Sequence, residues 1–449
     1  MAPGPIAVYH DLLSDAVAAD TQAELEAQTR LHGMYFGSRP VCSVLRPRFL
    51  TVEQDRFLRE RVAGLLPAFR RIYDAAMSNP EFRRQFGLRP EEDALLADDP
   101  GIPDPSPTAR LDAFLVGDDG LKFTEYNAET PAGAGYNDAL SDIFLGLPIL
   151  RRFLRRYHVQ PIPARPHVLH ALLDSYEQFC GHRSARPTIA ILDWSDVPTA
   201  SEFRVFERYF HDRGLAARIV DPREVEYSNG RLRADDFVIT LIYKRVLISE
   251  LLERGGLEHP VVRAVRDRAV CMVNGFRCKI LYKKASLAVL SDERNAAMFS
   301  DVERRLIAEH IPWTRVVAER TTEHAGRPVD LVPYILSRRE QFVLKPNDEY
   351  GGKGIVLGWT VDPATWDAAV AAALREPFVV QEKIDLPREP YPSWIDGRVQ
   401  LIDRMVDTNP FVGGSATMDG CLTRISTEAL LNVTAGGGST VPTFVVSER

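Results

Sequence analysis

The chain has 449 residues, of which 45% are hydrophobic and 26% charged, and its formal net charge at pH 7 is −7. This length allows two or three domains with a sizeable core, and the composition is that of an ordinary soluble globular protein. The acidic balance, with a sequence pI near 5.9, argues against a general nucleic-acid or membrane-surface binder.

Targeting signals and cysteine usage indicate a cytoplasmic protein. No apolar run approaches the roughly 20 residues that a membrane helix needs. Residues 1–15 lack a basic segment followed by an apolar core, so no signal peptide is expected. The five cysteines are an odd number without CxxC spacing, which is typical of a reducing compartment.

The first hundred residues have a helical pattern. Thr51 and Gln54 are spaced as in a capping box, which satisfies free amides at the start of a helix. Apolar residues follow at helical spacing from Leu58 to Tyr73 and predict one buried stripe. Pro67 lies inside the stripe and is expected to kink or split the helix, because proline has no amide hydrogen.

A strand pair is predicted next. Strand-like runs over residues 110–116 and 121–127 flank the turn sequence Gly117-Asp118-Asp119-Gly120. Alternate residues of a strand share a face. A two-residue loop at Asp118-Asp119 would place Asp112 opposite Glu125. The same register would place Arg110 opposite Asn127.

Two facing carboxylates repel each other unless a cation lies between them. The oxygen donors of Asp112, Glu125 and Asn127 are of the hard kind that Mg²⁺ prefers and usually shares with phosphate. The alternative is a solvated polar face of a hairpin. The position of Asp112 opposite Glu125 shifts the balance towards a metal site.

A parallel sheet is predicted in the middle of the chain. The expected elements are a helix over residues 138–157, a linker over 161–166, and strands over 188–192, 217–220 and 238–243. Thr199 and Glu202 are spaced as in a second capping box, before a helix that Gly214 ends. Strand and helix alternating at this spacing predict a Rossmann-like sheet, without the GxGxxG of a dinucleotide site. Lys244 and Arg245 follow the last of these strands. They could hold a substrate carboxylate, or they could be a solvated basic pair.

A glycine-rich loop follows a buried strand late in the chain. The strand, residues 342–346, contains Lys345 near its end, and the loop contains Gly351, Gly352, Lys353 and Gly354. Such loops let backbone amides approach phosphate oxygens, and a nearby ammonium adds positive charge. The loop is not a Walker A motif, and a plain hairpin turn is the alternative.

Three further segments have a polar residue at the edge of an apolar or glycine-rich run. Lys284, preceded by Lys283, opens an apolar helix-like run. Residues 377–384 form a strand that reaches polar residues, as a hinge that grips adenine and ribose would. Arg424 precedes the glycine-rich residues 431–438. Taken singly, each has an ordinary alternative: a surface lysine, a core strand or a loop.

Taken in order, these motifs resemble a known family. Lys284, Lys345-Pro346 with its loop, Gln381-Glu382, Arg424 and residues 432–437 are similar to the ATP-grasp core of glutathione synthetase-type ligases. Asp112 and the string from Phe123 to Pro131 resemble that family's metal-binding motif. This motif comes last in glutathione synthetase but first here, as in glutathionylspermidine synthetase and the circularly permuted ATP-grasp proteins.

The resemblance implies an α+β chain with a circularly permuted ATP-grasp fold and a Rossmann-like, pre-ATP-grasp α/β domain. The implied domains are an N-terminal helical region with the metal-binding strand pair (1–165), the Rossmann-like substrate domain (166–262) and the lid with the nucleotide-binding core (263–449). The motifs do not identify the glutathione- or polyamine-binding residues of the family, and no separate amidase domain is present. The specific substrate therefore does not transfer.

The resemblance also implies residue roles. Mg²⁺ would be held by Asp112, Glu125 and Asn127, and the ATP phosphates by Lys284 and Lys345, with Lys283 as an alternative to Lys284. The implied lid is Gly351, Gly352, Lys353 and Gly354, and the adenine and ribose contacts are Gln381, Glu382, Lys383 and Ile384. Arg110, Arg424 and Asn432 would face the transferring phosphoryl group or the acyl phosphate.

The implied activity is ATP- and Mg²⁺-dependent ligation of a small-molecule or peptide carboxylate to an amine. An acyl phosphate would be the intermediate, with ADP and phosphate released, and a homodimer is a possible assembly. One alternative is a phosphotransferase on the same fold. Another is a nucleotide-binding regulatory protein that does not turn over, although the intact motif residues count against it.

Overall fold

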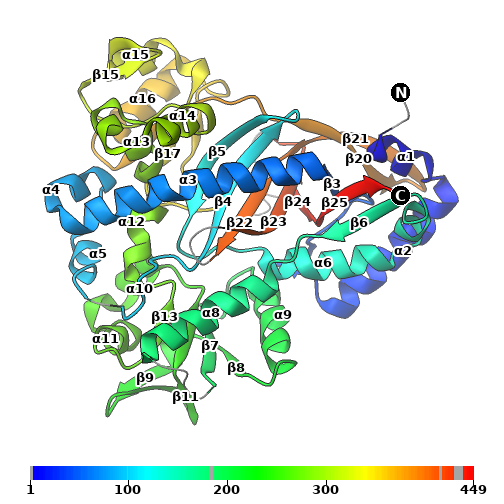
Figure 1. Cartoon of the computed structure of the whole chain (residues 1–449), viewed down its shortest axis with the longest axis horizontal. Helices are drawn as coiled ribbons and strands as arrows, with labels where there is room; N and C mark the ends of the chain where they lie inside the picture. The colour runs from blue at the N-terminus through cyan, green and yellow to red at the C-terminus, as the bar shows by residue number, and fades with distance from the viewer. Residues whose placement is uncertain (1–3, 99, 182–185, 414–416, 429–437) are drawn as a thin grey trace.

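A computed structural model describes residues 4–98, 100–181, 186–413, 417–428 and 438–449. Its centre is a seven-stranded sheet in the order β20-β21-β23-β22-β4-β5, with β24 paired to β23. The strands are β4 (Thr108–Val116), β5 (Gly120–Asn127), β20 (Arg388–Ile395), β21 (Arg398–Val406), β22 (Asn409–Gly413), β23 (Thr417–Ser426) and β24 (Gly438–Val441). Strands from the first and last thirds of the chain thus lie side by side (Figure 1). The expected mixture of helix and sheet is confirmed.

The long helix α3 (Val52–Ser78) crosses one face of this sheet (Figure 1). Its capping box at Thr51 and Gln54 is present, as predicted. Leu58, Val62 and the apolar residues that follow are buried against the inner residues of β4 and β5. The expected split at Pro67 is wrong: the helix runs through this exposed residue without interruption, because the buried stripe on both sides holds it against the sheet.

The β4–β5 hairpin has the predicted pairing but a different turn. Val116 pairs with Gly120, so the loop has three residues rather than two. Gly117 at its start has φ 67°, a left-handed conformation that glycine adopts without strain. A shift of register between Asp112 and Ala113 then adds one residue to β5. The two differences cancel, so Asp112 lies opposite Glu125 and Arg110 opposite Asn127.

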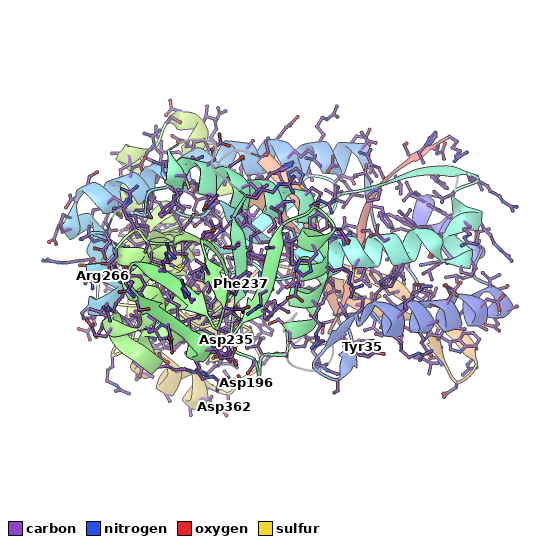
Figure 2. The ribbon with its side chains drawn as sticks, turned by 90° about the horizontal axis from the view of Figure 1, so that it is seen from below. Tyr35, Asp196, Asp235, Phe237, Arg266 and Asp362 are labelled. Atoms are coloured by element: carbon purple, nitrogen blue, oxygen red, sulfur yellow. The ribbon has the colours of Figure 1, made fainter. Side chains whose placement is uncertain are left out.

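A four-stranded parallel sheet in the order β13-β12-β7-β8 forms the expected Rossmann-like region. Its strands are β7 (Thr188–Leu192), β8 (Ala216–Val220), β12 (Leu241–Lys244) and β13 (Cys271–Val273). The single strand predicted over 238–243 is wrong, since β11 (Phe237–Ile239) belongs to a separate antiparallel sheet with β9 (Val225–Ser228) and β10 (Arg231–Ala234). Figure 2 shows Phe237 of β11, and Asp235 in the turn between β10 and β11, to the left of Tyr35.

Two more expectations in this region are corrected. The helix predicted over 138–157 is two helices, α6 (Ala134–Gly146) and α7 (Pro148–Phe153), because Pro148 cannot donate the next helical hydrogen bond. The predicted linker at 161–166 begins inside strand β6 (Tyr157–Pro161), which pairs with β25 (Thr443–Glu448) beside β3 (Arg48–Thr51). Thr199 makes no side-chain cap on α9 (Ala200–His211), because Glu202 turns away to bond the backbone amides of Gly133 and Gly135.

A further, smaller antiparallel sheet has the strand order β14-β19-β17-β18. It faces the central sheet across a cleft that residues of both sheets line. Its strands are β14 (Thr314–Val316), β17 (Phe342–Pro346), β18 (Val356–Leu357) and β19 (Phe378–Glu382), and the hairpin β15 (Thr321–His324) with β16 (Arg327–Asp330) lies nearby. Helices α15 (Leu331–Ser337) and α16 (Pro363–Ala373) pack on its outer face through Leu344, Trp366 and Val380.

The remaining elements surround these sheets (Figure 1). They are α1 (Pro5–Asp11), α2 (Asp15–His32), β1 (Tyr35–Phe36), β2 (Arg39–Pro40), α4 (Pro80–Arg83), α5 (Pro90–Leu95), α8 (Arg165–Cys180), α10 (Ile248–Gly255), α11 (Pro260–Arg266), α12 (Lys279–Tyr282), α13 (Ala285–Ser291) and α14 (Asp301–His310). Within the described ranges, no helix is long and apolar enough to cross a membrane.

Candidate active site

One cleft of about 160 Å³ lies between the central sheet and the smaller sheet. It is lined by predicted site residues from both parts of the chain: Asp112, Glu125, Lys345, Gly352, Gln381, Glu382, Lys383, Ile384 and Arg424. The fold thus brings the hairpin motif and the glycine-rich loop to one place, although more than 200 positions separate them in the sequence.

Asp112 lies at the polar end of the cleft between two arginines. Arg110 Nε lies 2.6 Å from Asp112 Oδ1, and Arg424 Nη2 lies 2.8 Å from Asp112 Oδ2. Burial alone would raise the pKa of Asp112, but the two guanidiniums hold it well below its usual range. The Asn127 side chain lowers this pKa further. Asp112 is therefore an ionised, oriented oxygen donor.

Arg424 is itself fixed by Asp407, which the sequence analysis did not single out. Arg424 Nε lies 2.6 Å from Asp407 Oδ2, and the Arg424 amide donates to Asp407 Oδ1. Arg424 is half-buried, and although desolvation alone would lower its pKa, Asp407 and Asp112 raise it. Asn409, two residues after Asp407, lines the cleft and accepts the Ala113 amide at 3.0 Å. The only sequence signal for this pair is Asp-x-Asn before an apolar strand.

Lys284, rather than Lys283, reaches the predicted metal-binding residues. Lys284 Nζ lies 3.0 Å from Glu125 Oε1. Lys283 Nζ instead lies 2.7 Å from Glu92 Oε2 and 2.8 Å from Asp348 Oδ2. This geometry favours Lys284 over Lys283 as the lysine that would face a nucleotide.

Lys345 projects from β17 into the middle of the cleft. Its Nζ donates to Gln381 Oε1 at 2.7 Å and to the Thr124 carbonyl at 3.2 Å. Burial lowers the pKa of Lys345 to about 8, although Glu125 partly opposes that shift. The ammonium is therefore a half-buried cation that makes no ion pair with a carboxylate among the described residues, which leaves it able to bind a phosphate.

The cleft continues from Lys345 to the end of β19 and the residues that follow it. Its apolar lining comes from Val343 of β17, Leu357 of β18 and Ile384 after β19. Gln381 Nε2 donates to Thr314 Oγ1 at 3.0 Å, which orients its carbonyl oxygen towards Lys345. Lys383 Nζ lies 4.7 Å from the centre of the Trp359 ring. The sequence analysis missed Trp359, which follows the glycine-rich loop and lines the cleft with Ile355 and Leu357.

The glycine-rich loop has the backbone conformation that requires glycine. Gly351, Gly352 and Gly354 have φ values of 65°, 77° and 71°. Asp348 at the start of the loop is held by Lys279, whose Nζ lies 2.6 Å from Asp348 Oδ1. Gly352 lines the cleft.

Lys353 differs from its expected role. Its side chain is 75% exposed and its Nζ lies 3.4 Å from Glu349 Oε2, so it faces solvent in this conformation of the loop. Asn432 lies outside the described residues.

Lys244 and Arg245 are neither a solvated pair nor free to hold a substrate carboxylate. Lys244 Nζ lies 3.3 Å from Glu129 Oε1, and Arg245 Nη2 lies 3.3 Å from Glu202 Oε2. All four side chains are buried. These residues join the Rossmann-like sheet to the segment after β5 through internal ion pairs.

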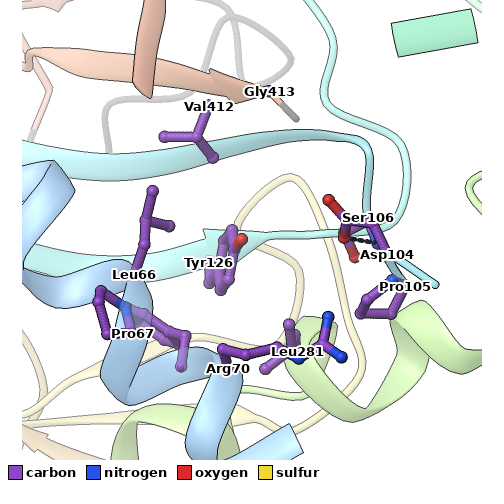
Figure 3. Close-up of a pocket in the computed structure, with 11 residues that line it drawn as sticks. Leu66, Pro67, Arg70, Asp104, Pro105, Ser106, Tyr126, Leu281, Val412 and Gly413 are labelled. Carbon is purple, nitrogen blue, oxygen red and sulfur yellow. Dashed lines mark hydrogen bonds between the residues drawn. The ribbon is translucent and has the colours of Figure 1, made fainter. Parts of the chain in front are cut away.

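A separate cavity of about 350 Å³ lies on the other face of β5. Figure 3 shows Tyr126 of β5 facing Leu66 and Pro67 of α3, with Asp104 and Ser106 at one side. Since neighbouring residues of a strand point to opposite faces, Tyr126 and Glu125 lie on opposite sides of the sheet. The central sheet therefore separates this cavity from the cleft.

No family model matches the chain. Two curated relatives are named "Putative glutamate–cysteine ligase 2-2", from Frankia casuarinae, and "Putative glutamate–cysteine ligase 2-3", from Frankia alni. They are 23% identical over 357 residues and 24% identical over 352 residues, each match covering 74% of this chain. The chain spans a little over a third of their length, 37% and 38%.

Among solved structures, a glutathione synthetase-like effector from Globodera pallida in its apo form is similar, with a TM-score of 0.59 and 12% identity. The match covers 96% of this chain and 98% of that one. The likeness is one of fold.

Proposed function

We propose that the chain is an ATP-dependent carboxylate–amine ligase with a circularly permuted ATP-grasp fold. The observation that carries the proposal is the single cleft that gathers Asp112, Glu125, Lys345, Arg424 and the residues at the end of β19. The names of the two curated relatives support the same general reaction, an ATP-dependent amide ligation.

The order of the motifs supports the permutation. The hairpin with Asp112 and Glu125 precedes the glycine-rich loop in the sequence, yet it pairs in the sheet with β22, which follows that loop, through Phe411 and Arg110. A chain with its termini at another place and its strands connected in another order could still present the same strands to the cleft. The sheet therefore tolerates either order of its motifs.

The residues at the polar end fit Mg²⁺. Asp112 and Glu125 face each other and Asn127 adds an amide oxygen, all of them hard donors. Arg110 and Arg424 now pair with Asp112, and Lys284 pairs with Glu125, so a bound cation would take over part of these contacts. Mg²⁺ bound there would neutralise charge on the β- and γ-phosphates of ATP.

The chain's own groups would complete the nucleotide site. Lys284 and Lys345 bring positive charge to the phosphates, and the amides around Gly352 can approach them closely. The apolar wall with Trp359 suits the flat adenine base, and Gln381 holds Lys345 in place. Closing of the glycine-rich loop would exclude water from the transferring group.

In the proposed reaction, a substrate carboxylate oxygen attacks the γ-phosphorus of ATP, and the bond to the β-phosphate oxygen breaks to release ADP. Arg110 and Arg424, with Asn432, would stabilise the charge on the acyl phosphate. The amine then attacks the acyl carbon, loses a proton and displaces phosphate. Exclusion of water matters because the acyl phosphate hydrolyses readily.

The test measures ADP release with Mg-ATP against a panel of carboxylates, with and without amines. Release that needs both an acid and an amine, and that disappears in Glu125→Ala, is expected for a ligase. Glu226→Ala, an exposed change on β9, should match the wild type. Release that needs the acid but no amine would indicate a phosphotransferase instead, and turnover unaffected by Glu125→Ala would contradict the metal site.

The pKa of Lys345 gives a pH dependence of nucleotide binding. Its pKa is lowered to about 8 by burial, so the side chain is charged below that pH and loses its charge above it. We expect the affinity for Mg-ATP to fall by at most about tenfold per pH unit above pH 8. Lys345→Arg should flatten this decline, because arginine stays charged. Equal slopes in the two proteins, measured by equilibrium titration, would show that Lys345 is not the titrating group.

A further inference from the structure

Two arginines contact one carboxylate near the N-terminal helices, away from the cleft, and a third arginine lies on the neighbouring strand. Arg46 Nη2 lies 2.7 Å from Glu389 Oε2, and Arg48 bonds the same carboxylate. Arg404 of β21 is the strand partner of Glu389 on β20, and helix α2 packs against both strands. We call Arg46, Arg48 and Arg404 the arginine cluster.

The positive charge of this cluster is not balanced. Burial lowers the pKa of all three arginines. By contrast Arg424, whose side chain is half-buried, has a raised pKa because the carboxylates of Asp407 and Asp112 flank it. A cation removed from solvent but surrounded by enough negative charge should have a raised pKa, as Arg424 has.

The other titratable groups facing the arginine cluster do not supply the missing negative charge. Burial raises the pKa of Tyr9 and of Cys42, so neither supplies a negative charge at neutral pH. Burial and Arg46 lower the pKa of His10 to about 4, so this ring carries no charge at neutral pH. Asp407, near Arg48, is already bonded to Arg424. Cys421, also near Arg48, has a raised pKa.

The cluster also has hydrogen-bond donors without acceptors. The Nε atoms of Arg46, Arg48 and Arg404 are buried and have no partner among the described residues. Arg46 is fully buried and Arg48 is 5% exposed. Buried donors left unpaired are destabilising, and guanidinium forks match the oxygen atoms of carboxylate, sulfate and phosphate.

We propose that the arginine cluster binds one small oxyanion, a carboxylate or an inorganic sulfate or phosphate, and that Glu389 occupies part of this site when the anion is absent. Glu389 is suited to such exchange because its side chain is 19% exposed, whereas those of Arg46 and Arg48 are 0% and 6% exposed. A site for a free oxyanion does not depend on the proposed ligase activity, whereas a site for a carboxylate of the acid substrate rests on it.

Two sources of the oxyanion are compatible with this chemistry. One is a free inorganic anion. The other is a second carboxylate of the acid substrate, since Asp407 connects the surroundings of Arg48 with Arg424 at the cleft. In the second case the site would select dicarboxylic over monocarboxylic acids.

The test is rescue of Glu389→Gln by added oxyanions. Thermal unfolding is measured in sodium chloride, sulfate, phosphate or glutamate at equal ionic strength. Glu389→Gln should unfold at a lower temperature than the wild type in chloride, and a saturating concentration of oxyanion should recover about 2–4 °C. The added change Arg404→Met, at a partly exposed residue, should abolish the recovery.

Glu293→Gln is the matched control. Glu293 also bonds two arginines, Arg315 at 2.8 Å and Arg320 at 2.9 Å, but Asp292 remains there to neutralise Arg320. The general stabilising effect of sulfate should be equal in both variants. Recovery of Glu389→Gln by sulfate, phosphate and glutamate alike supports a free-anion site, and recovery by glutamate alone supports the substrate carboxylate. No recovery beyond that of Glu293→Gln overturns the proposal.

Discussion

Replacing Lys345 with methionine is expected to lower the rate of Mg-ATP-dependent ADP release by about 10²–10³-fold, the loss typical when one preorganised charge is removed from a reacting group. Lys345 Nζ lies in the cleft, 2.7 Å from Gln381 Oε1, and makes no ion pair with a carboxylate in the part of the chain that the structure describes. Methionine keeps the length of the side chain and removes its charge. The measurement is initial-rate ADP release at saturating nucleotide.

The matched control is Lys122→Met. Lys122 lies on the same hairpin as Glu125, but its ammonium donates to the Glu309 carbonyl at the surface. Its removal should leave the rate within about twofold, since exposed contacts of this kind contribute little. Equal losses in the two variants would show that Lys345 acts only on stability, and an unchanged rate in Lys345→Met would contradict the placing of phosphates beside it.

Replacing Glu129 with glutamine is expected to lower the free energy of unfolding by about 3–5 kcal/mol. Glu129 is fully buried between Lys244 Nζ at 3.3 Å and Lys279 Nζ at 3.1 Å, and it accepts the Ile248 amide at 2.6 Å. The change leaves two buried ammonium groups short of negative charge. Denaturant unfolding measures the loss, and Lys244→Met in the same chain should recover part of it.

The effect of Glu129→Gln should also depend on pH. Burial alone would raise the pKa of Glu129, but Lys279 and Lys244 lower it below its ordinary value. A carboxylate with a lowered pKa stabilises the fold above its unfolded-state pKa, about 4.3, and loses that contribution as the pH falls through its folded-state pKa. The stability difference between wild type and Glu129→Gln should therefore be full at pH 7 and shrink in acid. A constant difference across that range would mean that the ion pairs are not its source.

The hairpin shows how far sequence reasoning reached and where it stopped. Alternation along the strands correctly paired Asp112 with Glu125, but the loop has three residues and β5 contains an extra residue that restores the register. The energies of two- and three-residue loops differ too little for the turn sequence to decide between them. The predicted pairing of Asp112 with Glu125 was correct because the extra residue in the loop is compensated by the extra residue in β5.

The buried ion pairs could not be predicted in the same way. Lys244 and Arg245 follow a strand as an ordinary basic pair would, and their partners Glu129 and Glu202 lie more than 40 positions away in the sequence. Only tertiary packing brings them together. The missing cap on α9 has the same origin, because Glu202 bonds Arg245 and the amides at the start of α6 instead.

The cleft itself was predicted better than its surroundings. Most of the predicted site residues on strands line it, although Arg110 and Asn127 do not, since strand position and face follow from alternation. Lys353 differs because it lies in a loop, where side-chain direction does not follow from sequence spacing. Trp359 and Asp407 were missed because a single aromatic or acidic residue beside a strand is common in ordinary cores and turns.

The most direct test is an equilibrium titration of a non-hydrolysable ATP analogue, with and without Mg²⁺, in the wild type and in Glu125→Gln. It needs no knowledge of the acid or the amine, and Trp359 in the cleft provides a fluorescence readout beside the heat of binding. We predict saturable binding that Mg²⁺ strengthens by at least about tenfold in the wild type, and that Mg²⁺ no longer strengthens in Glu125→Gln. The absence of binding, or binding that Mg²⁺ strengthens equally in both proteins, would contradict a magnesium–nucleotide site in this cleft.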